Sequence, residues 1–302
     1  MSALVQAQTA YPTKPITLVV GYPPGGSTDG AARRVARAFT DTLGSPVVIE
    51  NLAGATGAIG AQKVARAAPD GYTLLLGSTN EIVATKLFNP QQAYDGLTDF
   101  TYIGSVEHQG AIVLASPKSG LKSIDDLARR LKSAPPGSLS YGTSGVGSML
   151  HLSMELFMQK TGTNMVHVPY RGVSPLGVDL GGNNIEVGVM SLAAAKALVD
   201  AGKVVPLAVT TKARLPMFPS VPTMAEHPML KGYEVTGWFV VAGPKGLPAP
   251  VVAKLQSVLK TTLNNPEFRR QLEDGGGVPA SDSEDVAELV KMETTRYKTI
   301  AK

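Results

Sequence analysis

Residues 16–29 decide the fold and read Ile16-Thr17-Leu18-Val19-Val20-Gly21-Tyr22-Pro23-Pro24-Gly25-Gly26-Ser27-Thr28-Asp29. The first five are aliphatic or β-branched and predict a short buried strand. The glycines and prolines that follow predict a turn, after which apolar side chains recur at helical spacing as far as Leu43. A strand, a loop and a helix in this order indicate the repeating unit of an α/β protein.

The unit repeats along the rest of the chain. Further strands are expected at 47–50, 72–76, 111–115, 139–141, 165–170, 185–189, 204–210 and 235–242. Further helices are expected through 63–66 and at 124–131, 149–160, 193–201, 250–263, 268–272 and 283–302. Ser123 is the expected cap of the 124–131 helix, and Ser283 or Asp282 that of the last one. At about 150 residues per domain, 302 residues suit two such α/β domains.

The composition excludes several classes of protein. Lys and Arg number 28 against 24 Asp and Glu, a net charge of +4, and the densest basic group, Arg33, Arg34 and Arg37, fits the solvated face of a helix. Nucleic acid is therefore not expected as a partner. The absence of cysteine excludes disulfides, thiolate metal sites and cysteine nucleophiles. No apolar run approaches the roughly 18 residues of a membrane span, so insertion into a membrane is not expected.

No arrangement typical of catalysis is present. His151 and Glu155 lie four residues apart on one expected helix, but a third metal ligand is missing. The segment Gly142-Thr143-Ser144-Gly145-Val146 lacks the final glycine of a hydrolase nucleophile elbow, and the 145–147 segment lacks the third glycine of a dinucleotide site. We therefore expect no catalytic residue, no metal and no cofactor, and a function other than that of an enzyme.

Four segments rich in glycine and hydroxyl groups follow strands or precede helices, at 22–29, 54–57, 77–80 and 142–148. In open α/β sheets ligands bind at the carboxyl ends of the strands, and helix N-termini favour anions. Any one of these segments could be a simple turn with a helix cap. Their recurrence in both sets of elements predicts a cleft with one wall from each domain. Backbone amides and hydroxyls suit a carboxylate, whereas the phosphate motif Gly-x-x-x-x-Gly-Lys does not occur.

Arg171 follows the strand that ends near Tyr170 and is the candidate cation of this cleft. A guanidinium can hold a carboxylate with two parallel hydrogen bonds. Tyr170 or Tyr22 could cover the apolar body of a ligand, and His151 could brace the nearby 142–148 loop. The alternative is a surface arginine in a turn, and the sequence leaves both interpretations open.

Several separated motifs together resemble the Bug family, the TctC-like extracytoplasmic binding proteins of tripartite tricarboxylate transporters. They are Tyr11-Pro12-Thr13-Lys14-Pro15-Ile16, the 23–29 loop, Pro69-Asp70-Gly71-Tyr72, the 141–152 segment, His167-Val168-Pro169-Tyr170-Arg171-Gly172, Val221-Pro222-Thr223-Met224-Ala225-Glu226 and Trp238. The resemblance runs from Tyr11 to the C-terminus. It implies a fold like that of type II periplasmic binding proteins, with two α/β domains, a central ligand cleft and two crossovers near 104–111 and 232–238.

The resemblance also implies domain limits and ligand contacts. Domain 1 is expected at 11–107 and 237–302, and domain 2 at 108–236. Residues 1–10 are interpreted as the tail of an export signal, because Val5-Gln6-Ala7 fits a signal-peptidase site, although an ordinary flexible terminus would read the same. Ligand contacts are expected from Tyr22, Pro24, Gly25, Gly26, Ser27, Thr28 and Asp29, from Ser78, Thr79 and Asn80, from Thr143, Ser144, Gly145, Val146, Gly147, Ser148 and His151, and from Tyr170, Arg171, Met190 and Ser191.

Two departures from the family pattern bear on the ligand. Members usually carry lysine or a comparable residue where Arg171 stands, and often an aromatic residue and an aspartate after the strand that here ends in Met190-Ser191-Leu192. A guanidinium favours a second carboxylate, and the missing acid disfavours a ligand that carries an ammonium group. We therefore expect a dicarboxylate, either linear and of about adipate length or aromatic like terephthalate. Amino acids, citrate and monoacids stay open.

The function expected from the resemblance is that of a periplasmic, monomeric solute-binding protein. It would close on a carboxylate by a hinge motion and deliver it to the membrane permease of a tripartite tricarboxylate transporter. A ligand-sensing partner of a membrane sensor kinase is the alternative, and an enzyme on the same scaffold is a weaker one.

Overall fold

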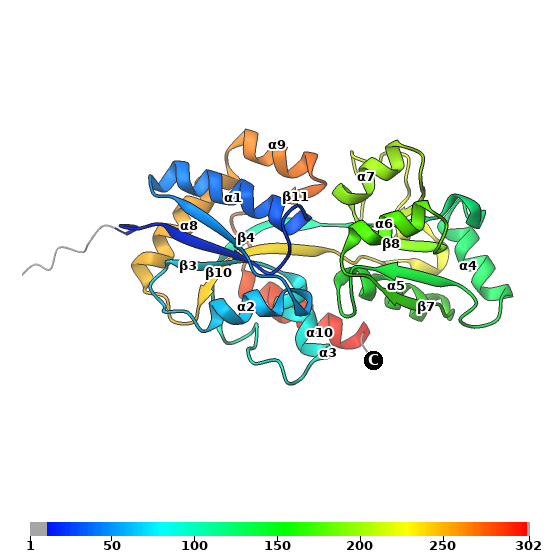
Figure 1. Cartoon of the computed structure of the whole chain (residues 1–302), viewed down its shortest axis with the longest axis horizontal. Helices are drawn as coiled ribbons and strands as arrows, with labels where there is room; N and C mark the ends of the chain where they lie inside the picture. The colour runs from blue at the N-terminus through cyan, green and yellow to red at the C-terminus, as the bar shows by residue number, and fades with distance from the viewer. Residues whose placement is uncertain (1–10, 301–302) are drawn as a thin grey trace, which may run out of the picture.

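A computed structural model describes residues 11–300 and arranges them in two lobes that lie side by side along the long axis of the molecule (Figure 1). The expected export-signal tail, residues 1–10, lies outside the described residues. Each lobe is built on one sheet. The sheet of the first lobe has the order β11-β4-β10-β3-β1-β2, and that of the second lobe has the order β7-β6-β8-β5-β9.

The strands of the first lobe are β1 (Ile16–Val20), β2 (Val47–Asn51), β3 (Thr73–Ser78), β4 (Phe100–Gln109), β10 (Gly237–Pro244) and β11 (Gly277–Pro279). Strand β1 pairs in parallel with β2 and β3, and β10 lies antiparallel between β3 and β4. The strands of the second lobe are β5 (Ala111–Ala115), β6 (Ser140–Thr143), β7 (Val166–Pro169), β8 (Val187–Ser191) and β9 (Val205–Val209). Strand β6 is parallel to β7 and β8, whereas β5 is antiparallel to β8 and β9.

Helices cover both faces of each sheet. One face of the first sheet packs against α1 (Ser27–Leu43), α8 (Ala249–Leu263) and α9 (Pro266–Asp274). The other face packs against α2 (Ala58–Ala65), the π-helical turn Asn80–Ala84 and α10 (Val286–Ile300), with the short α3 (Thr85–Phe88) following that turn. In the second lobe α4 (Ile124–Ser133) and α5 (Met149–Thr161) cover one face, and α6 (Val173–Gly181) and α7 (Leu192–Asp200) cover the other.

Helix α1 shows why the opening stretch folds as it does. Its apolar residues Ala32, Val35 and Phe39 are buried against the sheet, as their spacing predicts. The helix ends at Gly44, whose φ of 65° is left-handed and whose N–H bonds the carbonyl of Thr40. Glycine adopts this conformation at little cost, so the helix stops where the sequence indicates.

The chain passes between the lobes twice. It crosses from β4 to β5 through Gly110 and returns before β10 begins at Gly237. The yellow strand β10 and the red helix α10 therefore belong to the blue and cyan lobe of Figure 1. We keep 11–107 with 237–302, and 108–236, as proposed domains, although His108 and Gln109 still belong to a strand of the first sheet. Helix α10 also contacts α5 of the second lobe.

Three local expectations need correction. The 77–80 segment is not a loop, because β3 continues to Ser78 and a helical turn begins at Asn80. Helix α10 is capped by neither Ser283 nor Asp282: the carboxylate of Asp285 accepts hydrogen bonds from the backbone of residues 287 and 288. Strand β4 and helix α6 were not expected. By contrast, the Ser123 cap is confirmed, since its hydroxyl accepts from the Asp126 N–H at 3.1 Å.

Within residues 11–300, every helix is too short or too polar to traverse a bilayer.

Candidate ligand-binding site

A cavity of about 1,640 Å³ lies between the lobes and is lined by residues of both. It exceeds the roughly 300–1,000 Å³ of a typical small-molecule pocket, which leaves space for the lobes to move closer around a ligand. Most of the expected contact residues line it: Tyr22, Pro24, Gly25, Gly26, Ser27, Thr28, Ser78, Thr79, Asn80, Ser144, Gly145, Tyr170, Arg171, Met190 and Ser191. The fold thus brings together five segments that are far apart in the sequence.

The remaining expected contacts, Asp29, Thr143, Val146, Gly147, Ser148 and His151, do not line the cavity. Asp29 is 2% exposed, and its carboxylate accepts hydrogen bonds from Arg33 Nε at 2.8 Å, Gly25 N at 2.9 Å and Asn51 Nδ2 at 2.9 Å. Burial opposes the charge, but these donors hold the pKa of Asp29 below its ordinary value. Asp29 therefore fixes the 22–28 loop from behind.

Two histidines, His151 and His167, contact the 142–148 loop on the side away from the cavity lining and support it through hydrogen bonds. Gly147 N donates to His151 Nδ1 at 3.3 Å, and Ser148 Oγ accepts from His151 N at 3.2 Å, capping α5. Thr143 Oγ1 lies 2.7 Å from His167 Nε2. Val146 is the exception, since 51% of it is exposed to solvent. The expected brace by His151 is present in the structure.

The rings of His151 and His167 lie 4.2 Å apart between centroids. Burial, and secondarily the neighbouring His151, lowers the pKa of His167 to about 4, and burial lowers the pKa of His151 as well. Both rings are therefore neutral at pH 7. His151 Nε2 lies 3.4 Å from Glu155 Oε1. In the described part of the chain no three His, Asp or Glu residues gather as a metal site would require.

Tyr22 is the centre of a hydrogen-bonded cluster in the first-lobe wall. Its hydroxyl lies 3.0 Å from Glu81 Oε2 and 3.1 Å from the carbonyl oxygen of Thr56, and Asn80 Nδ2 donates to it at 3.0 Å. Glu81 also accepts from the Ser78 N–H at 2.6 Å and from the Ser78 hydroxyl. Because Glu81 is fully buried, the pKa of its carboxyl is raised to about 7. Glu81 thus orients two residues that line the cavity.

Thr79 and Asn80 connect this wall to other parts of the molecule. Thr79 Oγ1 accepts from the Trp238 N–H at 2.9 Å, which ties β10 to the end of β3. Asn80 Oδ1 accepts from the Met149 N–H at 2.9 Å, so it bonds the first residue of α5 in the other lobe. Both side chains act through hydrogen bonds that the sequence does not reveal.

Several helices begin at the cavity without a side-chain cap. Among them are α1, α6 and α7, whose preceding residues are Gly26, Gly172 and Ser191. The first-turn N–H groups of an uncapped helix lack partners inside the helix, and the helix dipole is positive at this end. Converging helix starts therefore favour a ligand with negative charge.

The charged side chains that line the cavity are all cationic: Arg34, Arg171 and Lys203. No Asp or Glu occurs among its described lining residues. Arg171 and Lys203 are exposed at the second-lobe wall. The expectation that Arg34 lies on a solvated face with Arg33 and Arg37 is wrong, because Arg34 lines the cavity and its side chain is only 23% exposed. It follows Ser27 by seven residues, or two helical turns, and this spacing is the signal that points it to the cavity.

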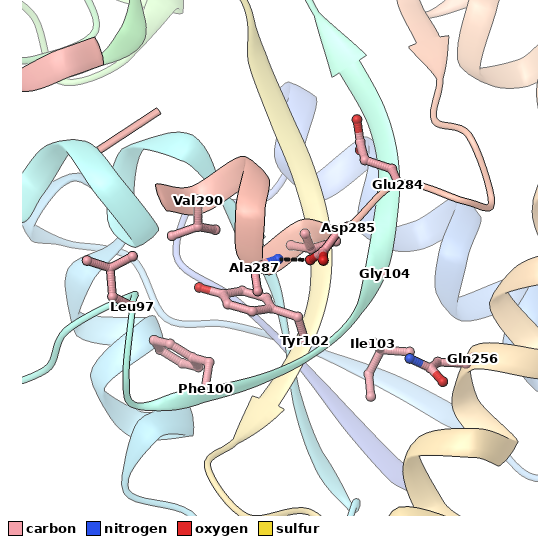
Figure 2. Close-up of a pocket in the computed structure, with 11 residues that line it drawn as sticks. Leu97, Phe100, Tyr102, Ile103, Gly104, Gln256, Glu284, Asp285, Ala287 and Val290 are labelled. Carbon is pink, nitrogen blue, oxygen red and sulfur yellow. Dashed lines mark hydrogen bonds between the residues drawn. The ribbon is translucent and has the colours of Figure 1, made fainter. Parts of the chain in front are cut away.

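A smaller cavity of about 410 Å³ lies within the first lobe, between β4, α8 and α10 (Figure 2). It is lined by apolar residues such as Phe100, Tyr102 and Val290, and also by Gln256 and the two acids Glu284 and Asp285. Asp285 caps α10, as the dashed line of Figure 2 shows, and Glu284 lies 2.9 Å from His108 Nε2. This cavity does not suit an anion, and the larger one is the candidate site.

Comparison with known proteins agrees with this geometry. Residues 31–302 match the model of a family described as tripartite tricarboxylate transporter family receptor. The protein BugT of Bordetella pertussis is 36% identical over 289 residues, covering 94% of this chain and 87% of BugT. Rpa4515 of R. palustris, solved with adipate, has a TM-score of 0.89 and 34% identity, covering 96% of this chain and 97% of that one. MatC of Rhodopseudomonas palustris, solved with bound malate, has a TM-score of 0.87 and 29% identity. The match covers 97% of this chain and 100% of MatC.

Proposed function

The chain belongs to the tripartite tricarboxylate transporter receptor family, and from this membership we propose that it captures a dicarboxylate in the cavity between its lobes. The family and the fold class expected from the sequence are thereby confirmed. The protein is a solute-binding protein of the tripartite tricarboxylate type, and relatives bind small carboxylates. The class of carboxylate is the part that we propose.

The observation that carries the proposal is the charge of the cavity. Arg34, Arg171 and Lys203 line it without any described acid, and the uncapped helices α1, α6 and α7 begin there. One carboxylate would be held by the backbone amides and hydroxyls of Ser27 and Thr28 and of the 144–145 segment. A single carboxylate leaves the cationic side chains without a partner, whereas a second one would pair with Arg171.

Two structural relatives support this class. Rpa4515 was solved with adipate and MatC with malate, and each of these ligands carries two carboxylates. In the present chain the wall near Arg171 also offers apolar contacts, from Pro175, Val178, Ala194 and Leu198. These contacts suit the methylene chain of an adipate-like ligand or the ring of a terephthalate-like one.

The family also indicates the setting in which the protein works. We place it in the periplasm as a monomer that delivers its ligand to the membrane permease of a tripartite tricarboxylate transporter. We propose no catalytic residue, because the acids behind the cavity walls, Asp29, Glu81 and Glu107, are buried and do not line it.

A thermal-shift screen tests the proposed function. It compares mono-, di- and tricarboxylates, linear and aromatic, with amines and sugars of similar size. A ligand that binds only the folded state at a hundredfold excess over its Kd stabilises that state by about 2.7 kcal/mol. We expect a large rise in Tm for a dicarboxylate and little for monoacids. A screen in which amines or sugars shift the Tm and no carboxylate does would refute the proposal.

A further inference from the structure

The first-lobe wall carries a cation that the sequence did not assign to the site. Arg34 lies on α1 and lines the cavity together with Gly30 and Gly275. A Cβ built on Gly30 would lie 3.6 Å from Nη1 of Arg34, and a Cβ built on Gly275 would lie 3.5 Å from Nη2 of Arg34. The side chain is 23% exposed, so its guanidinium is largely withdrawn from water and fixed in a narrow space.

The guanidinium of Arg34 has few partners. Its closest carboxylate contact joins Nη2 to Oε1 of Glu107 at 3.6 Å, which is longer than a hydrogen bond. Its Nε is buried without a partner among the described residues. A guanidinium has five N–H donors in a planar fork, and donors that stay unsatisfied when buried cost free energy. An anionic group of a ligand in the cavity would bind the donors of the guanidinium that remain exposed.

Glu107 is the acid paired with Arg34, but its carboxylate does not line the cavity. It is fully buried, its Oε1 accepts from Gln109 Nε2 at 3.0 Å, and its Oε2 is without a partner in the described structure. Gly277 lies so close to this carboxyl that a Cβ would collide with it, so the glycine leaves room for the buried acid. Glu107 does not line the cavity, so Arg34 is the member of the pair that faces a ligand.

Building on the proposed function, we propose that Arg34 binds the second carboxylate of the ligand from the first-lobe wall. Its Nη1 lies beside Gly30, which follows Ser27 by three residues, or about 4.5 Å of helix rise. A short dicarboxylate can span this separation, with one end at the uncapped start of α1 and the other at Arg34. Arg171 would then approach the same ligand from the second lobe, so that each lobe supplies one guanidinium.

The test measures binding of two matched ligand pairs, adipate with hexanoate and terephthalate with benzoate, by calorimetric titration. Replacing Arg34 alone would leave Glu107 buried without its cation and could unfold the protein. The comparison is therefore between Glu107→Gln and the double variant Arg34→Gln/Glu107→Gln. Arg37→Ala is the matched control, because it removes the same charge from the exposed side of the same helix.

We expect the double variant to bind the dicarboxylate about 10-fold to 100-fold more weakly than Glu107→Gln does, as for loss of a charged hydrogen-bond pair. The affinity of the double variant for the monoacid should differ from that of Glu107→Gln by less than about twofold. The dicarboxylate affinity of Arg37→Ala should likewise differ from that of the wild-type protein by less than about twofold. Equal dicarboxylate affinities in Glu107→Gln and the double variant would overturn the inference while leaving the proposed function intact. An equal loss for mono- and dicarboxylates would also overturn it. A wild-type protein that binds no carboxylate would overturn the proposed function, and the inference with it.

Discussion

The side-chain oxygen of Asn80 accepts a 2.9 Å hydrogen bond from the backbone N–H of Met149, and this bond joins the two lobes at the cavity. The amide nitrogen of the same side chain donates to the hydroxyl of Tyr22 at 3.0 Å. One asparagine therefore links the first-lobe wall to the start of α5. The position of the 142–148 loop relative to Tyr22 depends on this link.

Replacing Asn80 by alanine should weaken both stability and binding. We expect the free energy of unfolding to fall by about 1–2 kcal/mol, since both hydrogen bonds are lost, and dicarboxylate affinity to fall about tenfold. Urea unfolding and calorimetric titration measure the two effects. Asn184→Ala is the control, because it removes a single exposed hydrogen bond to Asp179. An Asn80→Ala variant with wild-type affinity would show that the link between the lobes does not shape the site.

Ser148 and Ser123 offer a matched pair of helix caps. Each hydroxyl accepts from a backbone N–H three residues later, at 3.2 Å in α5 and 3.1 Å in α4. Alanine at either position should lower the free energy of unfolding by about 1 kcal/mol. Ser148 additionally donates to the carbonyl of Gly145, a cavity residue, at 2.8 Å. Only Ser148→Ala should therefore reduce dicarboxylate affinity. Equal affinities in the two variants would contradict the assigned role of this loop.

The fold could be predicted from sequence wherever local patterns agree with tertiary packing. The strand at 111–115 and the helix starting at Met149 match β5 and α5, because apolar runs, caps and glycine stops all coincide there. Strand β4 was not expected, since its ten residues include Ser105, Glu107 and His108. Its pairing with β10 and β11 decides its conformation, and a single stretch of sequence does not show such pairing.

The site could be predicted where a loop follows a strand, and less well where contacts come from elsewhere. Glu81 reads as an ordinary surface acid, because nothing local shows that the distant Tyr22 encloses it. The spacing from Ser27 gives the helix face of Arg34, but the Gly275 turn that encloses its guanidinium is not visible in the local sequence. In both cases the missing information is a contact between segments more than fifty residues apart.

Glu81 gives the stability of the protein a definite dependence on pH. Its pKa of about 7 in the folded state lies above its ordinary value of 4.5 because it is buried. Between these two values the folded protein holds a proton that the unfolded chain has released. The contribution of Glu81 to the unfolding free energy is therefore fully present below about pH 4.5 and lost as the pH rises toward 7.

Replacing Glu81 by glutamine should remove this contribution. Between pH 5 and pH 8 the wild-type protein should lose on the order of 2 kcal/mol more unfolding free energy than Glu81→Gln does. Glu107 shifts in the same direction and stays in both proteins. Urea unfolding at several pH values measures the difference, with the exposed Glu273→Gln as the control. Parallel pH profiles for wild type and Glu81→Gln would rule out this assignment.

Arg171 should contribute to binding without contributing to stability. It lines the cavity and is exposed. We expect Arg171→Ala to weaken dicarboxylate binding about tenfold, to leave monoacid binding unchanged, and to leave the unfolding free energy within about 0.5 kcal/mol. Arg129→Ala removes an exposed charge of the second lobe outside the cavity and should change neither quantity. If Arg171→Ala kept the full dicarboxylate affinity, Arg171 would be a surface residue in a turn.

The central claim is that the cavity between the lobes selects ligands with two carboxylates. It is tested most directly by calorimetric titration of the wild-type protein with adipate, terephthalate and malate, each beside the closest monocarboxylate. We expect at least one dicarboxylate to bind more than about 100-fold more tightly than its monocarboxylate partner, as two charged hydrogen-bonded anchors require. Monocarboxylates that bind as tightly as their dicarboxylate partners would contradict the claim.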